Sequence, residues 1–252
     1  MEAVYGINPI KVLLATQGST PLKRIIVAEG RAGLVVKEII DVARQKKIPV
    51  EWRRRQYLDE LTGRMDHQGI VGFRDSFIYT DLDVLLENRN PCMSQDLILI
   101  LDGILDPQNL GSIIRSAYCL GANGVVIPAD RAASVTATVM KASAGSADKL
   151  PIARVTNLSR TIDDLKDKGF WVFGAETYGG KDIREHNFDV PVVLVLGSEE
   201  RGIRTLVKKK CDFLVTIPMA AKFDSFNVAV AAGIIQYAIL IHRMKKTSDV
   251  EG

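Results

Sequence analysis

The chain has 252 residues, of which 47% are hydrophobic and 25% are charged, and its formal net charge at pH 7 is +3. This composition is typical of a globular protein with a packed core, and it argues against a disordered, fibrous or membrane-spanning chain. The positive surplus is uneven, because Lys and Arg outnumber Asp and Glu by four in residues 1–79, with a dense run at Arg53-Arg54-Arg55. That distribution favours a nucleic-acid partner on the N-terminal side, although a solvated run of charge has the same pattern.

Cysteine usage and the N-terminus bear on the compartment. Cys92, Cys119 and Cys211 lie far apart and form no Cys-x-x-Cys or Cys/His cluster. Zinc and a disulfide framework are therefore not expected, and the cysteines are predicted to be reduced thiols. The N-terminus lacks the regions of a signal peptide, and no apolar run reaches the ~20 residues of a membrane span. We expect a cytoplasmic protein that binds no metal and no membrane.

Residues 1–79 predict a small α/β domain in which short strands alternate with helices. The strands are expected at 24–28, 48–52 and 70–73, and the helices at 34–43 and 56–61. The polar turn His67-Gln68-Gly69 precedes the last strand. Residues 80–95 contain a helical turn at 81–87 and the break Asn88-Arg89-Asn90-Pro91, so they are predicted to form a linker.

Residues 96–252 predict a second α/β domain. Its apolar runs are typical of strands buried on both faces of a parallel sheet, and they lie at 97–101, 125–127, 152–155, 170–174, 192–196 and 213–217. Helical patterns at 134–141 and 158–168 lie between them. Such alternation predicts a parallel sheet with helices on both faces.

The last predicted strand leads into an apolar helix. Pro218 stops the strand, and Asp224 and Ser225 offer side-chain oxygens as helix N-caps. From 226 to 241 the residues are almost all apolar, which predicts a helix buried on every side. A helix start beside Ser225 and Asn227 suits an anion or a carboxylate, although an ordinary Ser-capped joint has the same pattern.

Two earlier loops also follow predicted strands, where ligands bind in open α/β sheets. In the first, Asp106-Pro107 forms a turn, Asn109 lies where a helix begins, and Arg115 follows six residues later. A guanidinium held there suggests phosphate or carboxylate binding. The second loop has the pattern Gly197-x-Glu199-x-x-Gly202, which is not the glycine fingerprint of dinucleotide-binding proteins, so an NAD-dependent enzyme is disfavoured.

Together the three loops resemble, in order and spacing, the motifs of the SpoU (TrmH-type) family of RNA 2′-O-ribose methyltransferases, within the SPOUT superfamily. The first is Asp106-Pro107-x-Asn109-x-Gly111-x3-Arg115, the second Gly197-x-Glu199-x2-Gly202, and the third Ile217-Pro218-Met219 followed by Ser225-Phe226-Asn227-Val228. The third departs from the family pattern, because Phe226 replaces the usual Leu. Further similar positions are Tyr5–Pro9, His67–Val71, Ser143–Gly145 and Arg154–Leu158.

The resemblance implies a substrate-binding domain at 1–79 and a methyltransferase domain at 96–252 whose chain forms a deep trefoil knot. It implies a homodimer with the site near the subunit interface, and S-adenosylmethionine as the methyl donor. The donor would be held by Leu196, Gly197, Ile217, Met219, Phe226, Ser143 and Gly145. The catalytic residues would be Asn109, Arg115, Glu199, Ser225 and Asn227, and RNA would be bound by Arg53, Arg54, Arg55, His67 and Gln68.

The expected reaction is methyl transfer to a ribose 2′-hydroxyl, and the whole-length resemblance is closest to enzymes that modify a guanosine in 23S ribosomal RNA. Because a guanidinium normally stays protonated, Arg115 is expected to stabilise the developing alkoxide electrostatically rather than to act as the base. Two alternatives remain open: a transfer-RNA ribose methyltransferase of the same family, and an RNA-binding homologue without activity.

Overall fold

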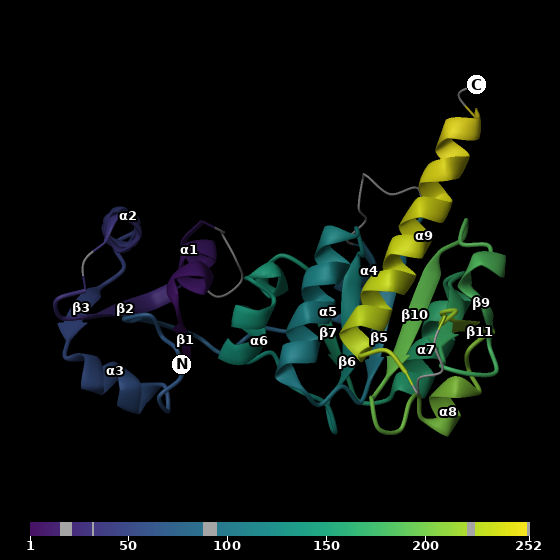
Figure 1. The fold of residues 1–252 in the computed structure, drawn as a ribbon, viewed down its shortest axis with the longest axis horizontal. Coiled ribbons are helices and arrows are strands. Elements are labelled where there is room, and N and C mark those ends of the chain that lie inside the picture. Colours follow the sequence, from purple (N-terminus) through teal and green to yellow (C-terminus); the bar gives the residue numbers. More distant parts are fainter. Residues whose placement is uncertain (16–21, 32, 88–94, 221–224, 251–252) are drawn as a thin grey trace. The chain divides into compact units, whose positions relative to one another are not determined.

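The computed structural model of the chain describes residues 1–15, 22–31, 33–87, 95–220 and 225–250. Predictions that concern Asp224, Cys92 and the break at 88–91 lie outside these residues. The chain divides into two compact units (Figure 1). The first unit comprises residues 1–78 and 134–149, and the second comprises residues 79–133 and 150–252.

The first unit is built on a four-stranded sheet of order β1-β4-β2-β3, in which only β2 and β3 run parallel. Its first strand and helix were not predicted from the sequence, where Asn-Pro is a dipeptide common in turns. Pro9 instead lies in the first turn of a helix, where its missing N–H is not needed. The elements are β1 (Glu2–Tyr5), α1 (Ile7–Ala15), β2 (Leu22–Ala28), α2 (Leu34–Gln45), β3 (Val50–Arg53), α3 (Arg55–Leu61), β4 (Ile70–Arg74), α6 (Ala137–Ala142) and η1 (Ser146–Asp148).

Residues 134–149 lie in sequence between two strands of the second unit but pack within the first. Helix α6 contacts β1, where the hydroxyl oxygens of Tyr5 and Thr138 are 3.3 Å apart. Farther along, Arg74 Nη1 donates to Asp148 Oδ1 at 2.8 Å, and both side chains are fully buried. Burial raises the pKa of Asp148, and the charge of Arg74 only partly offsets this effect.

The second unit confirms the predicted α/β class with a parallel sheet. Its seven strands have the order β7-β6-β5-β10-β8-β11-β9, and every neighbouring pair is parallel. The elements are α4 (Leu82–Glu87), β5 (Leu97–Asp102), α5 (Pro107–Cys119), β6 (Gly124–Pro128), β7 (Ile152–Val155), α7 (Leu158–Asp167), β8 (Trp171–Ala175), β9 (Lys181–Asp182), η2 (Ile183–Glu185), β10 (Val192–Gly197), α8 (Thr205–Lys208), β11 (Phe213–Thr216) and α9 (Val228–Val250).

Helices cover both faces of this sheet. On one face, Ile98 and Ile100 of β5 belong to a buried cluster with Leu85 of α4 and with Leu158 and Ile162 of α7. On the other, α5 and α9 lie side by side (Figure 1) and contact β6 and β10. The continuous apolar pattern of β5 is explained by this burial, since all six of its residues are buried.

The apolar part of α9, residues 228–241, is not buried on all sides, so the prediction of a fully buried helix is wrong for a single chain. Ile235 and Ile239 are buried, whereas Val230 is 50% exposed and Tyr237 is 57% exposed. The helix also begins at 228 rather than 226 and continues to 250. No helix within the described residues is long and apolar enough to cross a bilayer.

Arg243 fastens α9 to the starts of two central strands. Its buried guanidinium donates to four backbone carbonyls, those of Gln95, Asp96, Phe188 and Val190, at 2.8 to 3.1 Å. Burial lowers the pKa of Arg243 to about 10, so the group remains charged at neutral pH. Because residues 95–96 precede β5 and residues 188–190 precede β10, this contact holds the helix to the edge of the sheet where these strands begin.

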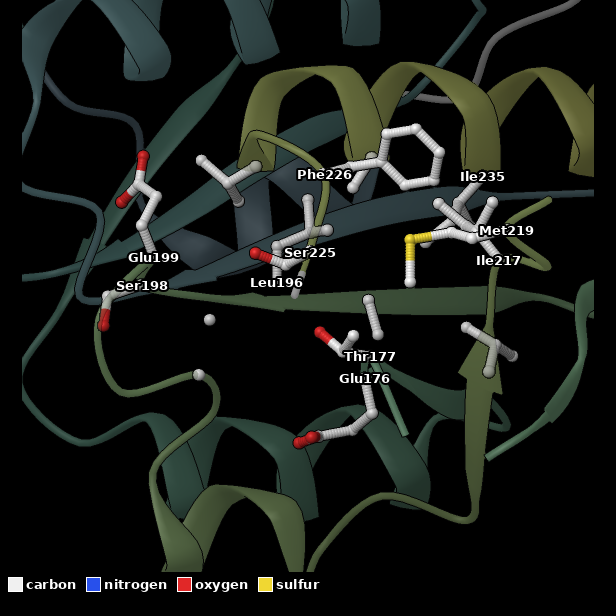
Figure 2. A pocket seen from close by; sticks show the side chains of 16 residues that line it. Glu176, Thr177, Leu196, Ser198, Glu199, Ile217, Met219, Ser225, Phe226 and Ile235 are labelled. Atoms are coloured by element: carbon white, nitrogen blue, oxygen red, sulfur yellow. The ribbon is translucent and has the colours of Figure 1, made fainter. Parts of the chain in front are cut away.

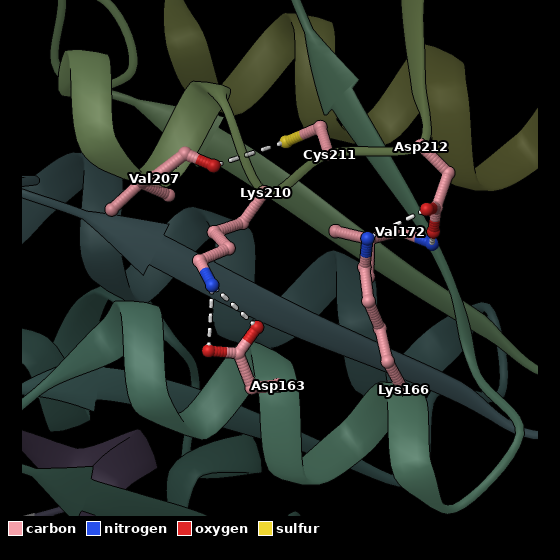
Figure 3. Close-up of polar contacts among 7 residues, drawn as sticks. All are labelled: Asp163, Lys166, Val172, Val207, Lys210, Cys211 and Asp212. Carbon is pink, nitrogen blue, oxygen red and sulfur yellow. Dashed lines mark hydrogen bonds and ion pairs between the residues drawn. The ribbon is translucent and has the colours of Figure 1, made fainter.

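The segment before β11 is held by polar contacts of Lys210 and Asp212 (Figure 3). Lys210 Nζ donates to both carboxylate oxygens of Asp163 in α7, at 2.8 and 2.7 Å. The carboxylate of Asp212 accepts from the backbone N–H of Val172 at 2.9 Å and from Lys166 Nζ at 2.6 Å. These contacts lie where β8 and β11 begin, at the edge of the sheet opposite to the carboxyl-terminal ends of its strands.

We expect Arg74→Met to lower the free energy of unfolding of the first unit by about 3–5 kcal/mol, because it leaves a buried carboxylate without its cation. Burial raises the folded-state pKa of Asp148, and the lost cation raises it further. The folded state then binds a proton that the unfolded state releases above pH 3.8, so the stability of the variant should fall as pH rises from there.

Urea unfolding followed by tryptophan fluorescence measures this effect. In a Trp171→Phe background the remaining tryptophan, Trp52, reports on the first unit alone. The control is Arg74→Met combined with Asp148→Leu, which removes both charges and should regain most of the loss. Equal losses in the single and double variants would contradict a role for the ion pair.

Candidate active site

A pocket lies where β8, β10 and β11 end and α9 begins. The empty space in and at the mouth of the pocket, open solvent included, is about 760 Å³. In Figure 2 the side chains of Ile217, Met219 and Phe226 gather on one side, and those of Ser198 and Glu199 lie on the other. The pocket is lined by Ala175, Glu176, Thr177, Leu196, Gly197, Ser198, Glu199, Gly202, Val215, Ile217, Met219, Ser225, Phe226, Val228, Ala231 and Ile235.

The loop after β10 is closed on itself and requires glycine at both of its ends. Gly202 has φ 62°, which favours glycine, and its N–H donates to the carbonyl of Ser198 at 2.8 Å. A Cβ on Gly197 would lie 2.1 Å from the carbonyl carbon of Gly202. The spacing Gly197-x4-Gly202 therefore reflects a turn in which two backbone segments touch.

A chain of hydrogen bonds joins the three loops that the sequence singled out. The side-chain amide of Asn109, in the first turn of α5, donates to Glu199 Oε1. Asn227 Nδ2 donates to Asn109 Oδ1 at 3.0 Å. The structure thus brings together Asn109, Glu199 and Asn227, which lie up to 118 positions apart in sequence.

The residue that caps α9 is Asn227, not Ser225 as predicted. Asn227 Oδ1 accepts from the backbone N–H groups of Ala229 and Val230, at 3.0 and 3.3 Å. The helix begins at Val228, so Asn227 occupies the N-cap position. Ser225 lies too early in the chain for this role, and it lines the pocket instead.

Arg115 does not line the pocket. Its side chain is exposed on α5, six residues after Asn109, and it makes no hydrogen bond or ion pair within the described residues. The helix itself begins as predicted, because Asp106 Oδ1 accepts from the backbone N–H of Gln108 at 2.9 Å and Pro107 fills the first helical position. The guanidinium is therefore available to a molecule outside the chain.

Most of the predicted donor-binding residues meet in the pocket, and two do not. Leu196, Gly197, Ile217, Met219 and Phe226 line it. Ser143 and Gly145 instead belong to the first unit, where both are buried.

Sequence reasoning missed the pocket residues contributed by β8 and by the buried side of α9. Glu176 and Thr177 directly follow β8, so the rule that ligands bind at strand ends could have indicated them. Ala231 and Ile235 are four residues apart on α9. Their position could not be read from the sequence, because every side of that helix is apolar.

The lining residues fit a cationic, partly apolar ligand. Leu196, Ile217 and Ile235 supply apolar walls, and the described residues that line the pocket include no Lys or Arg. Glu176 and Glu199 supply carboxylates; Glu176 also forms an ion pair with Lys208 Nζ at 3.2 Å. Such a lining suits the adenosine and the sulfonium of S-adenosylmethionine better than it suits a phosphate-bearing nucleotide.

The residues predicted to bind RNA occupy one end of the first unit. Arg53, Arg54 and Arg55 are exposed where β3 ends and α3 begins. Arg53 Nη2 also donates to Glu51 Oε2 at 2.9 Å. Gln68 is exposed with φ 52°, and its Oε1 accepts from the backbone N–H of Ile7 at 3.0 Å.

His67 is buried, with only 1% of the residue exposed, whereas contact with RNA would require an exposed side chain. Its Nε2 lies 2.8 Å from Asp59 Oδ1, and its Nδ1 accepts from the backbone N–H of Gly69 at 3.0 Å. The ring therefore supports the turn that presents Gln68.

Comparison with known proteins agrees with this geometry. Residues 96–237 match the model of the SpoU rRNA Methylase family, and residues 3–79 match the model of RNA 2′-O ribose methyltransferase substrate binding. Over 236 residues the chain is 39% identical to YacO of Bacillus subtilis, which is named as a TrmH family tRNA/rRNA methyltransferase, covering 93% of this chain and 94% of that protein.

A solved structure of similar architecture carries the methyl donor. It is the SpoU methyltransferase AviRb from Streptomyces viridochromogenes in complex with AdoMet, with a TM-score of 0.79 and 26% identity, covering 96% of this chain and 90% of that one. A second relative, from Staphylococcus aureus (strain MSSA476), is 40% identical over 223 residues, which is 88% of this chain and 90% of that protein.

The chain belongs to the SpoU rRNA methylase family of the SPOUT superfamily. It is an RNA 2′-O-ribose methyltransferase that uses S-adenosylmethionine.

Proposed function

We propose that this enzyme methylates the 2′-oxygen of a guanosine in 23S ribosomal RNA and works as a homodimer with a knotted methyltransferase domain. The observation that carries the proposal is the hydrogen-bonded chain Glu199–Asn109–Asn227, which gathers three distant loops beside one pocket. The choice of RNA rests on the resemblance over the whole length, which includes the substrate-binding region at 3–79.

In this proposal the pocket holds S-adenosylmethionine, whose sulfonium supplies an electrophilic methyl group when bound. Leu196, Ile217 and Phe226 contact the donor with apolar side chains and with backbone groups of their loops. Gly197 lets the chain pass close to Gly202 and so shapes the pocket wall. Ser225 offers its hydroxyl to the bound donor, since it lines the pocket and does not cap α9.

We assign to Arg115 the role of orienting and activating the ribose 2′-hydroxyl. A ribose hydroxyl is a weak nucleophile, and the oxygen gains negative charge as its proton leaves. A guanidinium stabilises that charge and can also pair with a phosphate of the RNA, so one side chain orients and activates the same nucleotide. Arg115 is exposed and has no intramolecular partner within the described residues, as a group that binds an incoming substrate should be.

Glu199, Asn109 and Asn227 act in this proposal through the loops that they connect. Glu199 accepts from Asn109, and Asn109 accepts from Asn227. Each loop is therefore ordered by the next before any ligand arrives. Preorganisation of this sort reduces the entropy that would otherwise be lost on binding.

RNA is bound in this proposal by the exposed end of the first unit, through Arg53, Arg54, Arg55 and Gln68. These arginines supply phosphate contacts, which give affinity without sequence preference. A base must be unpaired for its ribose to reach the methyl donor, so the target is expected in a loop.

The homodimer is supported by an apolar stripe on α9. Val230, Ile234 and Tyr237 are exposed at spacings of four and three residues, which places them on one side of the helix. A contiguous exposed apolar surface is typical of an interface, and a two-fold axis would let the same stripe meet its copy.

The target RNA can be identified by mapping 2′-O-methyl groups in total RNA from cells with and without the gene. We expect one guanosine of 23S RNA to lose its methyl group, and the wild-type gene to restore it. Arg115→Ala should not restore it, because the developing charge on the 2′-oxygen is then unopposed. Calorimetry should show that purified Arg115→Ala binds S-adenosylmethionine within about twofold of the wild type, a difference of only ~0.4 kcal/mol.

Other outcomes distinguish the alternatives. Loss of a methyl group from a transfer RNA would identify the tRNA-modifying alternative. No lost methyl group, together with a wild type that does not bind the donor, would indicate an RNA-binding protein without activity. Equal loss of donor binding and methyl transfer in Arg115→Ala would contradict the role assigned to this residue.

Neutralising the arginine run should weaken RNA binding and flatten its dependence on salt. Replacing Arg53, Arg54 and Arg55 by Gln should reduce the slope of log affinity against log salt by about 2–3, because fewer counterions are released. Filter binding to deproteinised 23S RNA from cells that lack the gene measures this. The control is Lys166→Gln with Lys168→Gln, which removes positive charges from the second unit. An unchanged slope in the triple variant would show that the arginine run does not bind RNA.

The dimer can be tested by sedimentation equilibrium. We expect the wild type to be dimeric and Ile234→Asp to be monomeric at micromolar concentration, because the substitution places a charge in the centre of the stripe. Leu206→Asp is the matched control, since Leu206 is exposed but lies on α8. A monomeric wild type would contradict the proposal.

A further inference from the structure

Asp102 is a buried carboxylate that none of the three motifs contains. It ends β5, and its side chain is fully buried. Asp102 Oδ2 accepts from the backbone N–H of Arg204 at 2.8 Å, and Oδ1 accepts from Arg204 Nε at 2.6 Å. Because burying a charge is costly unless it is paired and hydrogen-bonded, this carboxylate strongly constrains the position of Arg204.

Asp102 also lies beside Gly197, the first residue of the segment 197–204. In the parallel pair of β5 and β10, Asp102 is the register partner of Gly197. The chain then turns through the closed loop at 198–202, passes the buried Ile203 and reaches Arg204. One residue therefore fixes both ends of this loop, the first through the sheet and the second through its carboxylate.

The loop held in this way forms one wall of the pocket. Gly197, Ser198, Glu199 and Gly202 all line it. Glu199 is also the acceptor for Asn109, so a displaced loop would disturb the contact with α5. A shift of the loop would thus change the shape of the pocket and break its link to the first motif.

We propose that Asp102 is a positioning residue for the methyl donor, which acts through Arg204 to hold residues 197–203 in their binding conformation. The inference rests on the assignment of the pocket to S-adenosylmethionine. It assigns Asp102 no contact with the RNA and no part in the chemical step. A loss of Asp102 should therefore appear in donor affinity.

The test is Asp102→Asn, which keeps the size of the side chain but loses its charge and turns an amide nitrogen toward a donor of Arg204. We expect the dissociation constant for S-adenosylmethionine, measured by calorimetry, to rise at least tenfold, or ~1.4 kcal/mol. The KM for the donor should rise in parallel, while kcat at saturating donor stays within about twofold, because the chemical step is unaffected.

The matched control is Asp212→Asn. Asp212 also accepts from a backbone N–H and from a cation, but Val172 and Lys166 lie away from the pocket. The affinity of Asp212→Asn for the methyl donor should equal that of the wild type even where its melting temperature falls.

A milder change is Arg204→Lys, which keeps the charge and the backbone N–H but loses Nε, so a smaller loss of affinity for the methyl donor is expected. Combined with Asp102→Asn it should add little, since both act through one contact.

Unchanged donor affinity in Asp102→Asn would overturn the proposal, as would an equal fall in donor affinity in Asp212→Asn. If Asp102→Asn does not fold, Arg204→Lys decides: a weaker donor affinity supports the proposal, and an unchanged one overturns it. Ala231→Phe, which fills the pocket, separates this test from the assignment of the pocket. Normal donor binding in Ala231→Phe would contradict the assignment, whereas normal binding in Asp102→Asn alone would contradict only the positioning role.

Discussion

The contact between Asn109 and Asn227 is the constraint on which the rest of the site depends. It joins the first turn of α5 to the residue that caps α9, and Asn109 also donates a hydrogen bond to Glu199. An amide side chain is suited to such a link, because it donates and accepts at the same time. Removal of either Asn would leave partners of the chain without a hydrogen bond.

Asn227 has two structural tasks, which explains why the start of α9 and the shape of the pocket are coupled. Its oxygen caps the helix, and its nitrogen reaches Asn109. Val228, Ala231 and Ile235 then follow on the side of the helix that lines the pocket. Since Arg243, farther along α9, donates to four carbonyls, the helix is held on both sides of its pocket-lining residues.

Local patterns in the sequence predicted the parallel sheet, and the family resemblance indicated seven of the sixteen residues that line the pocket. Continuous apolar runs marked the buried strands, and the rule about strand ends placed Gly197, Glu199 and Ile217 at one edge. The capping residue could not be predicted in this way. Asp224, Ser225 and Asn227 are all good caps, and only the observed start of the helix at 228 identifies Asn227.

Exposure of α9 was also beyond local patterns, since composition shows that a helix is apolar but not what covers it. The donor-binding role that the family resemblance implies for Ser143 and Gly145 stays a prediction. Gly145 has φ 83°, and a Cβ there would lie 2.2 Å from Val12 Cγ1. Close packing against α1 and a left-handed backbone are two structural reasons for glycine at this position. A glycine that a motif marks can therefore serve the packing of its own unit, and only the fold separates that case from Gly197, which meets backbone at the pocket wall.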